Sequence, residues 1–238
     1  MTINLFCLPP AGSSAALYTA WKKQVTNDIT IVPVEYPGHG ALAKQPLLHD
    51  PDILAHHIIT EIKSHPLSPF MLFGHSVGAA LLWRVIAAIE HTPLFKQLKM
   101  IIVSGRPTHS YTRKMPAKHL LSRAGLINLL RHYNNVPSEL FQNEDAMNFF
   151  LAILRNDLHL NDNMLQDRVK KINRPLLVFY GKDDPDIPSH SHMLAWQEYT
   201  TQWLGCYPLA GDHFFFNELS SRKAMFDKIA AAVSKLTS

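Results

Sequence analysis

The chain has little cysteine: Cys7 and Cys206 are the only two in 238 residues. Two cysteines exclude a disulfide-stapled scaffold, and both lie in apolar, strand-like runs, so we expect reduced thiols in a cytoplasmic protein. No apolar run approaches the roughly 20 residues of a membrane span, and the first residues lack the basic segment of a signal peptide. We therefore expect neither secretion nor a membrane partner.

The chain also has only a small excess of charge of one sign. The 23 lysines and arginines exceed the 19 acidic residues by only a net +4, far from the strongly basic balance of nucleic-acid-binding proteins. No cysteine and histidine cluster suggests a metal, and nothing calls for an organic cofactor, so we expect neither. Internal repeats and low-complexity segments are absent. A hydrophobic content of 47% suits one well-buried domain over 1–238, which we expect to be a monomer.

One long stretch contains no acidic residue at all. Between His91 and Ser138 there is no Asp or Glu, whereas eight basic residues occur there: Lys96, Lys99, Arg106, Arg113, Lys114, Lys118, Arg123 and Arg131. The stretch is either an ordinary solvated face or a basic docking surface for an acidic partner beside the site entrance. The sequence leaves both interpretations open.

Apolar strand patterns alternate with helical patterns along most of the chain. Strands are expected at Ile3–Leu8, Ile29–Val34, Phe70–Phe73, Met100–Ser104, Pro175–Tyr180 and Gln202–Tyr207, and helices at Leu17–Val25, Asp50–Lys63, Val77–Ile89 and from about Asn217 to Leu236. This alternation predicts an α/β fold with a mostly parallel central sheet and helices on both faces.

The interval between Arg106 and Asn173 breaks the alternation and is too long for a loop in a compact domain. It contains two amphipathic helical stretches, Ala117–His132 and Asp145–Leu154. We expect a helical lid insertion at about 107–172, lying over the site.

A nucleophile motif follows the third expected strand. Gly74-His75-Ser76-Val77-Gly78 lies between the apolar run Phe70–Phe73 and a helical stretch, as in the nucleophile elbow of α/β-hydrolases. A β-carbon at either glycine would collide with the neighbouring strand or helix. The pattern therefore predicts Ser76 as the nucleophile of an α/β-hydrolase.

A serine needs a histidine base and a carboxylate that orients it, in the chain order Ser, acid, His. His213 follows the last strand in a short loop before the final helix, where this fold places its base. The acid loop after Val178-Phe179-Tyr180 offers three candidates: Asp184 first, Asp186 in reserve and Asp183 third. The stretch Ser104-Gly105-Arg106-Pro107 offers no carboxylate, which strengthens Asp184.

Two backbone N–H groups are needed to bind the oxyanion of the tetrahedral intermediate. Val77 begins the helix after the nucleophile, where free amides favour negative charge. The second donor should come from the loop after the first strand. Pro9 and Pro10 have no N–H, so Ala11 is the natural choice.

Several motifs together resemble one family. They are Leu8-Pro9-Pro10-Ala11-Gly12-Ser13, Tyr36-Pro37-Gly38-His39-Gly40, Phe73-Gly74-His75-Ser76-Val77-Gly78, Val103-Ser104-Gly105-Arg106 and Gly211-Asp212-His213-Phe214-Phe215. Their order and approximate spacing are similar to those of type II thioesterases, the stand-alone editing hydrolases of nonribosomal peptide and polyketide synthases. The resemblance implies hydrolysis of acyl thioesters on the phosphopantetheine arm of acyl- or peptidyl-carrier proteins, for editing or for release of intermediates.

The chain departs from the family pattern at three places. His39 stands where the family usually has arginine, Arg155-Asn156-Asp157-Leu158 where it has Arg-Ala-Asp-Phe, and Pro10 where a polar residue is more usual. These departures leave the lid contacts and the acyl-chain preference open. A carboxylesterase or lipase acting on oxygen esters would share the catalytic residues, and a non-catalytic binding module is a minor alternative.

Overall fold

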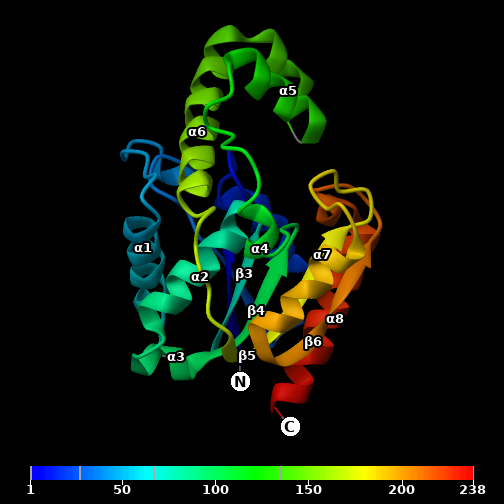
Figure 1. Ribbon diagram of the computed structural model, residues 1–238. Helices are drawn as coiled ribbons and strands as arrows, with labels where there is room; N and C mark the ends of the chain where they lie inside the picture. Colours follow the sequence, from blue (N-terminus) through cyan, green and yellow to red (C-terminus); the bar gives the residue numbers. More distant parts are fainter. Residues whose placement is uncertain (1, 27, 67, 134–135, 238) are drawn as a thin grey trace.

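The computed structural model describes residues 2–26, 28–66, 68–133 and 136–237. Its centre is a six-stranded sheet in the order β2-β1-β3-β4-β5-β6, and every pair of neighbouring strands is parallel (Figure 1). The strands are β1 (Ile3–Leu8), β2 (Ile29–Pro33), β3 (Phe70–His75), β4 (Leu98–Ser104), β5 (Ile172–Gly181) and β6 (Thr200–Leu209). The predicted parallel sheet is confirmed, and the crossovers are the helices that the alternation requires.

Each strand buries side chains on both faces of the sheet. In β1, Phe6 and Leu8 pack with α1 (Pro51–Ser64) and α2 (Val77–Ile89), whereas Leu5 and Cys7 pack on the opposite face against α8 (Leu219–Thr237). Short helices complete the two layers: α3 (Pro93–Gln97), α7 (His190–Leu194), and the 3₁₀ helices η1 (Ala15–Lys23), η2 (Gly40–Leu42), η4 (Ala195–Tyr199) and η5 (Phe215–Asn217). Burial on both faces explains why the strands read as continuous apolar runs.

Capping residues set the helix starts. Asp50 accepts hydrogen bonds from the Asp52 and Ile53 amides, and Pro51 occupies the first turn of α1, as its sequence predicts. The helix expected at Leu17–Val25 is instead the 3₁₀ helix η1, which begins after its cap Ser14. The prediction of an apolar face was correct, since Tyr18 and Trp21 of η1 are buried against the sheet. The predicted helix type and bounds were wrong.

The segment between β4 and β5 forms the lid, which we define as the described residues from 105 to 171. It contains α4 (His109–Thr112), α5 (Arg123–Tyr133), η3 (Ser138–Gln142) and α6 (Glu144–Asn163), and Figure 1 shows α5 and α6 above one end of the sheet. Its helices share a small apolar cluster of their own: Leu126, Leu130, Met147, Leu151, Leu154 and Leu158.

The bounds of both predicted lid helices need correction. Residue 117 does not begin a helix, because α5 starts only at Arg123, and α6 continues past Leu154 to Asn163. The second half of α6 buries Asp157 and Asn161 along with Leu158 and Leu160. Buried polar residues interrupt the apolar periodicity, which is why the pattern ended too early.

The stretch without acids does not form one basic surface. Lys96 and Lys99 lie on α3 and at the start of β4, at the end of the sheet away from the lid (Figure 1). Arg106 is buried, and Lys118 pairs with Asp186. The eight basic residues therefore do not form a single docking surface, and Arg131 is among those that remain exposed on the lid. In the described part of the chain, no helix is both long and apolar enough to span a membrane.

Candidate active site

The turn after β3 holds Ser76 in a strained conformation. Its φ of 54° makes it the one non-glycine residue with a positive φ among the described residues. A Cβ on Gly74 would lie 2.4 Å from the Gly78 carbonyl oxygen, and a Cβ on Gly78 would lie 2.3 Å from that of Leu8. Only glycine fits at both positions, so the two glycines permit the sharp turn that presents the serine at the carboxyl edge of the sheet.

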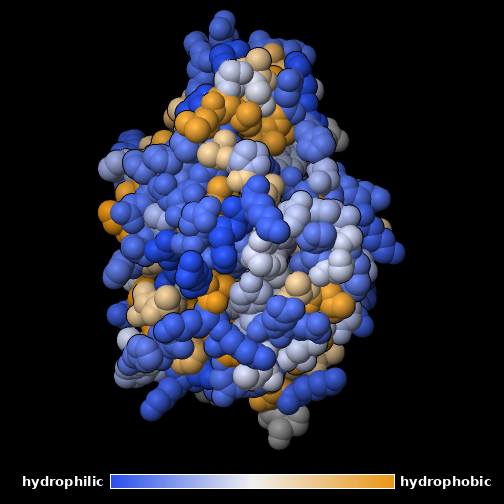
Figure 2. Space-filling view, viewed as in Figure 1, coloured by the Kyte–Doolittle hydropathy of each residue, from blue (hydrophilic) through white to orange (hydrophobic). Residues whose placement is uncertain are grey.

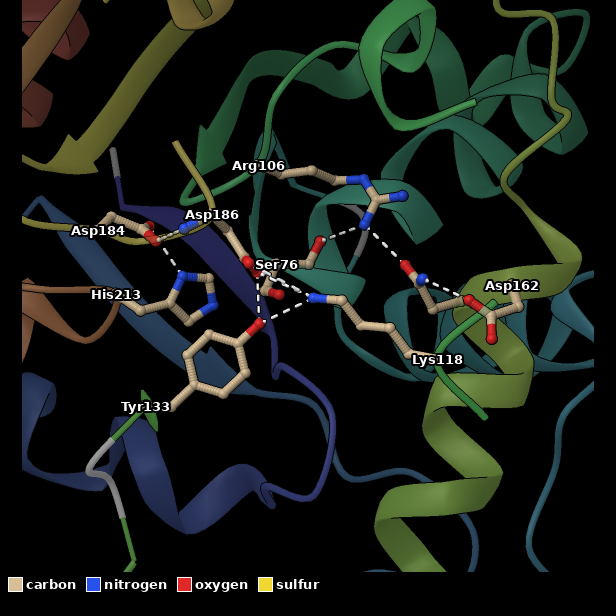
Figure 3. Close-up of polar contacts among 9 residues, drawn as sticks. Ser76, Arg106, Lys118, Tyr133, Asp162, Asp184, Asp186 and His213 are labelled. Atoms are coloured by element: carbon tan, nitrogen blue, oxygen red, sulfur yellow. Dashed lines mark hydrogen bonds and ion pairs between the residues drawn. The ribbon is translucent and has the colours of Figure 1, made fainter. Parts of the chain in front are cut away.

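The loops after β5 and β6 bring Asp184 and His213 together. Asp184 Oδ2 lies 2.8 Å from His213 Nδ1, and both side chains are buried (Figure 3). The loops pass each other at Gly181, where a Cβ would lie 1.9 Å from the Asp212 carbonyl oxygen. The Asp183 amide also donates to the Gly211 carbonyl at 3.0 Å, which ties the acid loop to the histidine loop.

The two reserve carboxylates have other surroundings. Asp183 is exposed, and Asp186 accepts hydrogen bonds from Tyr133 and, at 3.3 Å, from Lys118 (Figure 3). Burial by itself raises the pKa of Asp186, but Lys118, His213 and the Tyr133 hydroxyl together outweigh it and lower that pKa. Of the three candidates, the structure brings Asp184 to the histidine.

A second histidine lies beside His213. The ring of His75 is 4.7 Å from that of His213, and its Nδ1 is 2.9 Å from Ser104 Oγ. Burial, and then the charge of His213, lower the pKa of His75 well below its ordinary value. His75 is therefore neutral, and it packs beside the candidate base without adding positive charge.

Both predicted oxyanion donors lie on the same cavity as the serine. Val77 is the first residue of α2, and Ala11 follows β1; both line the cavity together with Ser76 and His213. The close approach of Gly78 to the backbone of Leu8 and Pro9 brings the start of α2 against the loop that contains Ala11.

The cavity has a volume of about 550 Å³ and lies between the lid and the carboxyl edge of the sheet. Apolar side chains from the lid line most of one side, including Leu130, Phe150, Leu154 and Leu158. Close to Ser76 the lining is polar, with Arg106, Lys118 and Asp186. A largely apolar chamber next to a serine and a histidine suits an acyl group of low polarity.

The model of the thioesterase domain family matches residues 3–233, nearly the whole chain. The chain belongs to the thioesterase family. Its substrates are accordingly thioesters, and it is a serine hydrolase with an α/β-hydrolase fold.

Known relatives match this thioesterase over most of their length. Linear gramicidin dehydrogenase LgrE of Brevibacillus parabrevis is 29% identical, covering 90% of this chain and 82% of the relative. Gramicidin S biosynthesis protein GrsT of Aneurinibacillus migulanus is 26% identical, covering 91% and 84%. The solved structure of BorB, a type II thioesterase from the borrelidin biosynthetic cluster, is 28% identical with a TM-score of 0.81, covering 98% and 93%.

Arg106 is a buried cation of this thioesterase for which the sequence predicted no role within the site. Its Nη1 donates to Asn161 Oδ1 at 2.8 Å and to the Ser76 carbonyl oxygen at 3.5 Å. Burial lowers the pKa of Arg106 to about 10, so it stays charged at neutral pH. It connects the lid helix α6 to the nucleophile turn.

Tyr133 is a second residue of the thioesterase that sequence reasoning missed. Its ring lies 4.8 Å from that of His213, and its hydroxyl donates to Asp186. It is the last residue of α5, so the lid reaches the base through it. No sequence signal marks Tyr133, because the contact depends on how the lid folds back.

One departure from the family pattern, His39, contacts the aspartate of the lid motif, which the pattern keeps. His39 Nε2 lies 2.9 Å from Asp157 Oδ2, and the same oxygen accepts the Gly12 N–H at 2.8 Å. His39 thus connects its loop to the lid through Asp157. In the described ranges, no group of three or more His, Cys, Asp or Glu side chains is placed so that it could hold a metal ion.

Proposed function

We propose that this thioesterase hydrolyses acyl groups held as thioesters on the phosphopantetheine arm of acyl- or peptidyl-carrier proteins of a nonribosomal peptide or polyketide synthase. The observation that carries the proposal is the strained Ser76 on one cavity with His213, whose Nδ1 is held by Asp184. The names of GrsT, a gramicidin S biosynthesis protein, and BorB, a type II thioesterase from the borrelidin biosynthetic cluster, support the class of substrate.

In the proposed mechanism, Ser76 Oγ attacks the thioester carbonyl carbon while His213 Nε2 takes the hydroxyl proton. The negative charge then develops on the former carbonyl oxygen, which the amides of Ala11 and Val77 bind. Collapse of the intermediate breaks the carbon–sulfur bond, and His213 gives its proton to the leaving thiolate. Water, deprotonated by His213, then hydrolyses the acyl-serine, releasing the carboxylic acid and restoring Ser76.

Asp184 has the orienting role in this mechanism. Its carboxylate accepts the Nδ1 proton at 2.8 Å, which leaves Nε2 free to accept the serine proton and stabilises the imidazolium that forms. Asp186 lies beside the same histidine as a second negative charge, but its oxygens are bound to the lid. We therefore assign the acid to Asp184.

The surface of the lid supports a protein partner. Leu120 and Phe149 are 74% and 63% exposed, and Figure 2 shows apolar surface gathered on the lid. Arg123 and Arg131 are exposed there as well. Apolar side chains among basic ones suit an acidic carrier protein, which would place its phosphopantetheine arm near the cavity.

The test follows acyl-phosphopantetheinyl carrier protein by mass spectrometry, with the wild type and with Ser76→Ala. Deacylation by the wild type alone, with weaker turnover of the matching acyl-coenzyme A, supports the proposal. Brisk cleavage of p-nitrophenyl esters without deacylation of the carrier would show an oxygen-ester hydrolase instead. Inactivity on both substrates would point to a binding module.

A further inference from the structure

One carboxylate oxygen of the lid joins two loops of the core. Asp157 Oδ2, on α6, accepts the backbone N–H of Gly12 at 2.8 Å and faces His39 Nε2 at 2.9 Å. Asp157 and His39 are each only 3% exposed. A buried carboxylate with two donors on a single oxygen is a fixed arrangement, because water cannot replace either partner.

The geometry assigns both protons of His39. Its Nδ1 lies 3.1 Å from the Pro37 carbonyl oxygen, which can only accept, so Nδ1 carries a proton. Its Nε2 faces a carboxylate oxygen that already accepts the Gly12 N–H, so Nε2 donates as well. A histidine that donates from both nitrogens is an imidazolium, and it forms a buried ion pair with Asp157.

Gly12 belongs to the turn that carries the proposed oxyanion donor. The Ser13 amide donates to the Pro10 carbonyl at 3.2 Å, so Ala11 and Gly12 are the central residues of a four-residue turn. Gly12 has a φ of +72°, and a Cβ there would lie 3.1 Å from the ring of Phe150 on α6. The hydrogen bond from Gly12 to Asp157 therefore fixes the turn directly beside the Ala11 N–H.

We propose that Asp157 and His39 are positioning residues of the oxyanion hole: the lid carboxylate holds the turn that presents the Ala11 N–H, and the imidazolium of His39 holds the carboxylate in place. The inference rests on the proposed function, since it presumes that Ala11 binds a developing oxyanion. It makes α6 part of the catalytic framework as well as a cover for the acyl chain.

The arrangement depends on the charge of His39. The charged and titratable groups that face His39 are Asp157 on α6, and Glu35 and Tyr36 on its own loop. Burial by itself lowers the pKa of His39, but Asp157, the Pro37 carbonyl and Glu35 outweigh it and raise that pKa above its ordinary value. The ion pair is complete below this pKa and is lost as the pH rises through it, because a neutral imidazole has no charge and keeps only one proton for its two acceptors.

The test compares Asp157→Asn, His39→Gln and the control Asn163→Ala on the same acyl thioester. In Asp157→Asn the amide oxygen is neutral, so its hydrogen bonds to the Gly12 N–H and to a charged His39 weaken, and kcat should fall about tenfold or more, with KM little changed. In His39→Gln, the side-chain amide lies near the position of Nε2, and its charge does not change with pH. From about pH 7 to about pH 9, the kcat of His39→Gln should therefore decline less than the kcat of the wild type.

Asn163→Ala removes a different bond between α6 and the core, from Asn163 Nδ2 to the His49 carbonyl oxygen at 2.9 Å. Equal losses of kcat in Asn163→Ala and Asp157→Asn would overturn the inference, because the effect would then be general loosening of α6. An unchanged alkaline decline in His39→Gln would also overturn it. Thermal unfolding of each variant shows whether it is folded.

A readout without catalysis separates this inference from the proposed function. Nitrogen-15 NMR of the wild type at neutral pH should show protons on both His39 nitrogens, and the Gly12 amide should exchange with solvent faster in Asp157→Asn. A neutral His39, or an unchanged Gly12 exchange rate, would contradict the inference even in an active enzyme. The NMR result stands even if the protein does not hydrolyse carrier thioesters.

Discussion

At the residue scale, Asp184 and Asp186 are two positions apart but have different partners. Asp184→Asn keeps the shape of the side chain, but its amide can donate to His213 Nδ1 and so favours the wrong tautomer. We expect kcat to fall by about 10⁴-fold. In Asp186→Asn the loss should be far smaller, because this carboxylate contacts Lys118 and Tyr133 and leaves the bond between Asp184 and His213 intact.

Steady-state hydrolysis of an acyl thioester by the two variants measures the difference, with circular dichroism as the control for folding. A larger loss in Asp186→Asn would transfer the role of the acid to that residue.

The sequence limited the acid to three aspartates in one loop but could not choose among them with certainty. The choice depends on how Gly181 lets the acid loop pass the Asp212 carbonyl, and on lid residues more than 50 positions away in the chain that bind Asp186. Ser76 and His213 were easier to predict, because local motifs and their place after a strand mark each of them.

At the scale of elements, the end of α5 is attached to the acid loop by the hydroxyl of Tyr133. Tyr133→Phe keeps the ring beside His213 but removes the hydrogen bond to Asp186. A hydrogen bond to a charged group contributes about 1.5–3 kcal/mol. We therefore expect the amides of α5 to exchange with solvent about tenfold faster, since local opening becomes easier.

Hydrogen–deuterium exchange, followed by mass spectrometry on peptides from α5, measures this opening, and peptides from α2 serve as the internal control. If α5 exchanges at the wild-type rate in Tyr133→Phe, the hydroxyl does not hold the lid.

The elements that sequence reading placed well are those that bury an unbroken apolar pattern. The strands of the sheet and α2 belong to this group, and their predicted bounds differ from the structure by a few residues at most. The lid was harder to read, because α6 has buried polar residues whose partners, His39 and Arg106, lie on other loops. Such contacts leave no periodic signal.

At the scale of the whole molecule, the parallel sheet explains why residues far apart in sequence share one cavity. The carboxyl ends of parallel strands lie at one edge, so the loops after β1, β3, β4, β5 and β6 all meet there. The lid then closes this edge with the helices of a single insertion. The general position of the site could be predicted from the parallel strands and the motifs that follow them, but the contacts between lid and loops could not.

Acid stability is also a property of the whole fold, and His109 is a sensitive probe of it. The side chain is fully buried, its ring 5.5 Å from that of Trp196, and neither ring nitrogen has a hydrogen-bond partner among the described residues. Burial, followed by the charges of Arg106 and Arg113, lowers the pKa of His109 from 6.5 to about 3. The folded protein therefore keeps this histidine neutral, whereas the unfolded chain takes up a proton below about pH 6.5.

The free energy of unfolding should consequently fall as the pH drops from about 6.5 toward 3, by about 1.4 kcal/mol per pH unit for this one group. His109→Phe keeps an aromatic ring in place but has no proton to bind. Between about pH 7 and pH 5, the variant should lose about 2 kcal/mol less stability than the wild type. Urea unfolding at the two pH values measures both losses, and His75 contributes equally to each protein. Equal losses would mean that His109 is not held neutral by the fold.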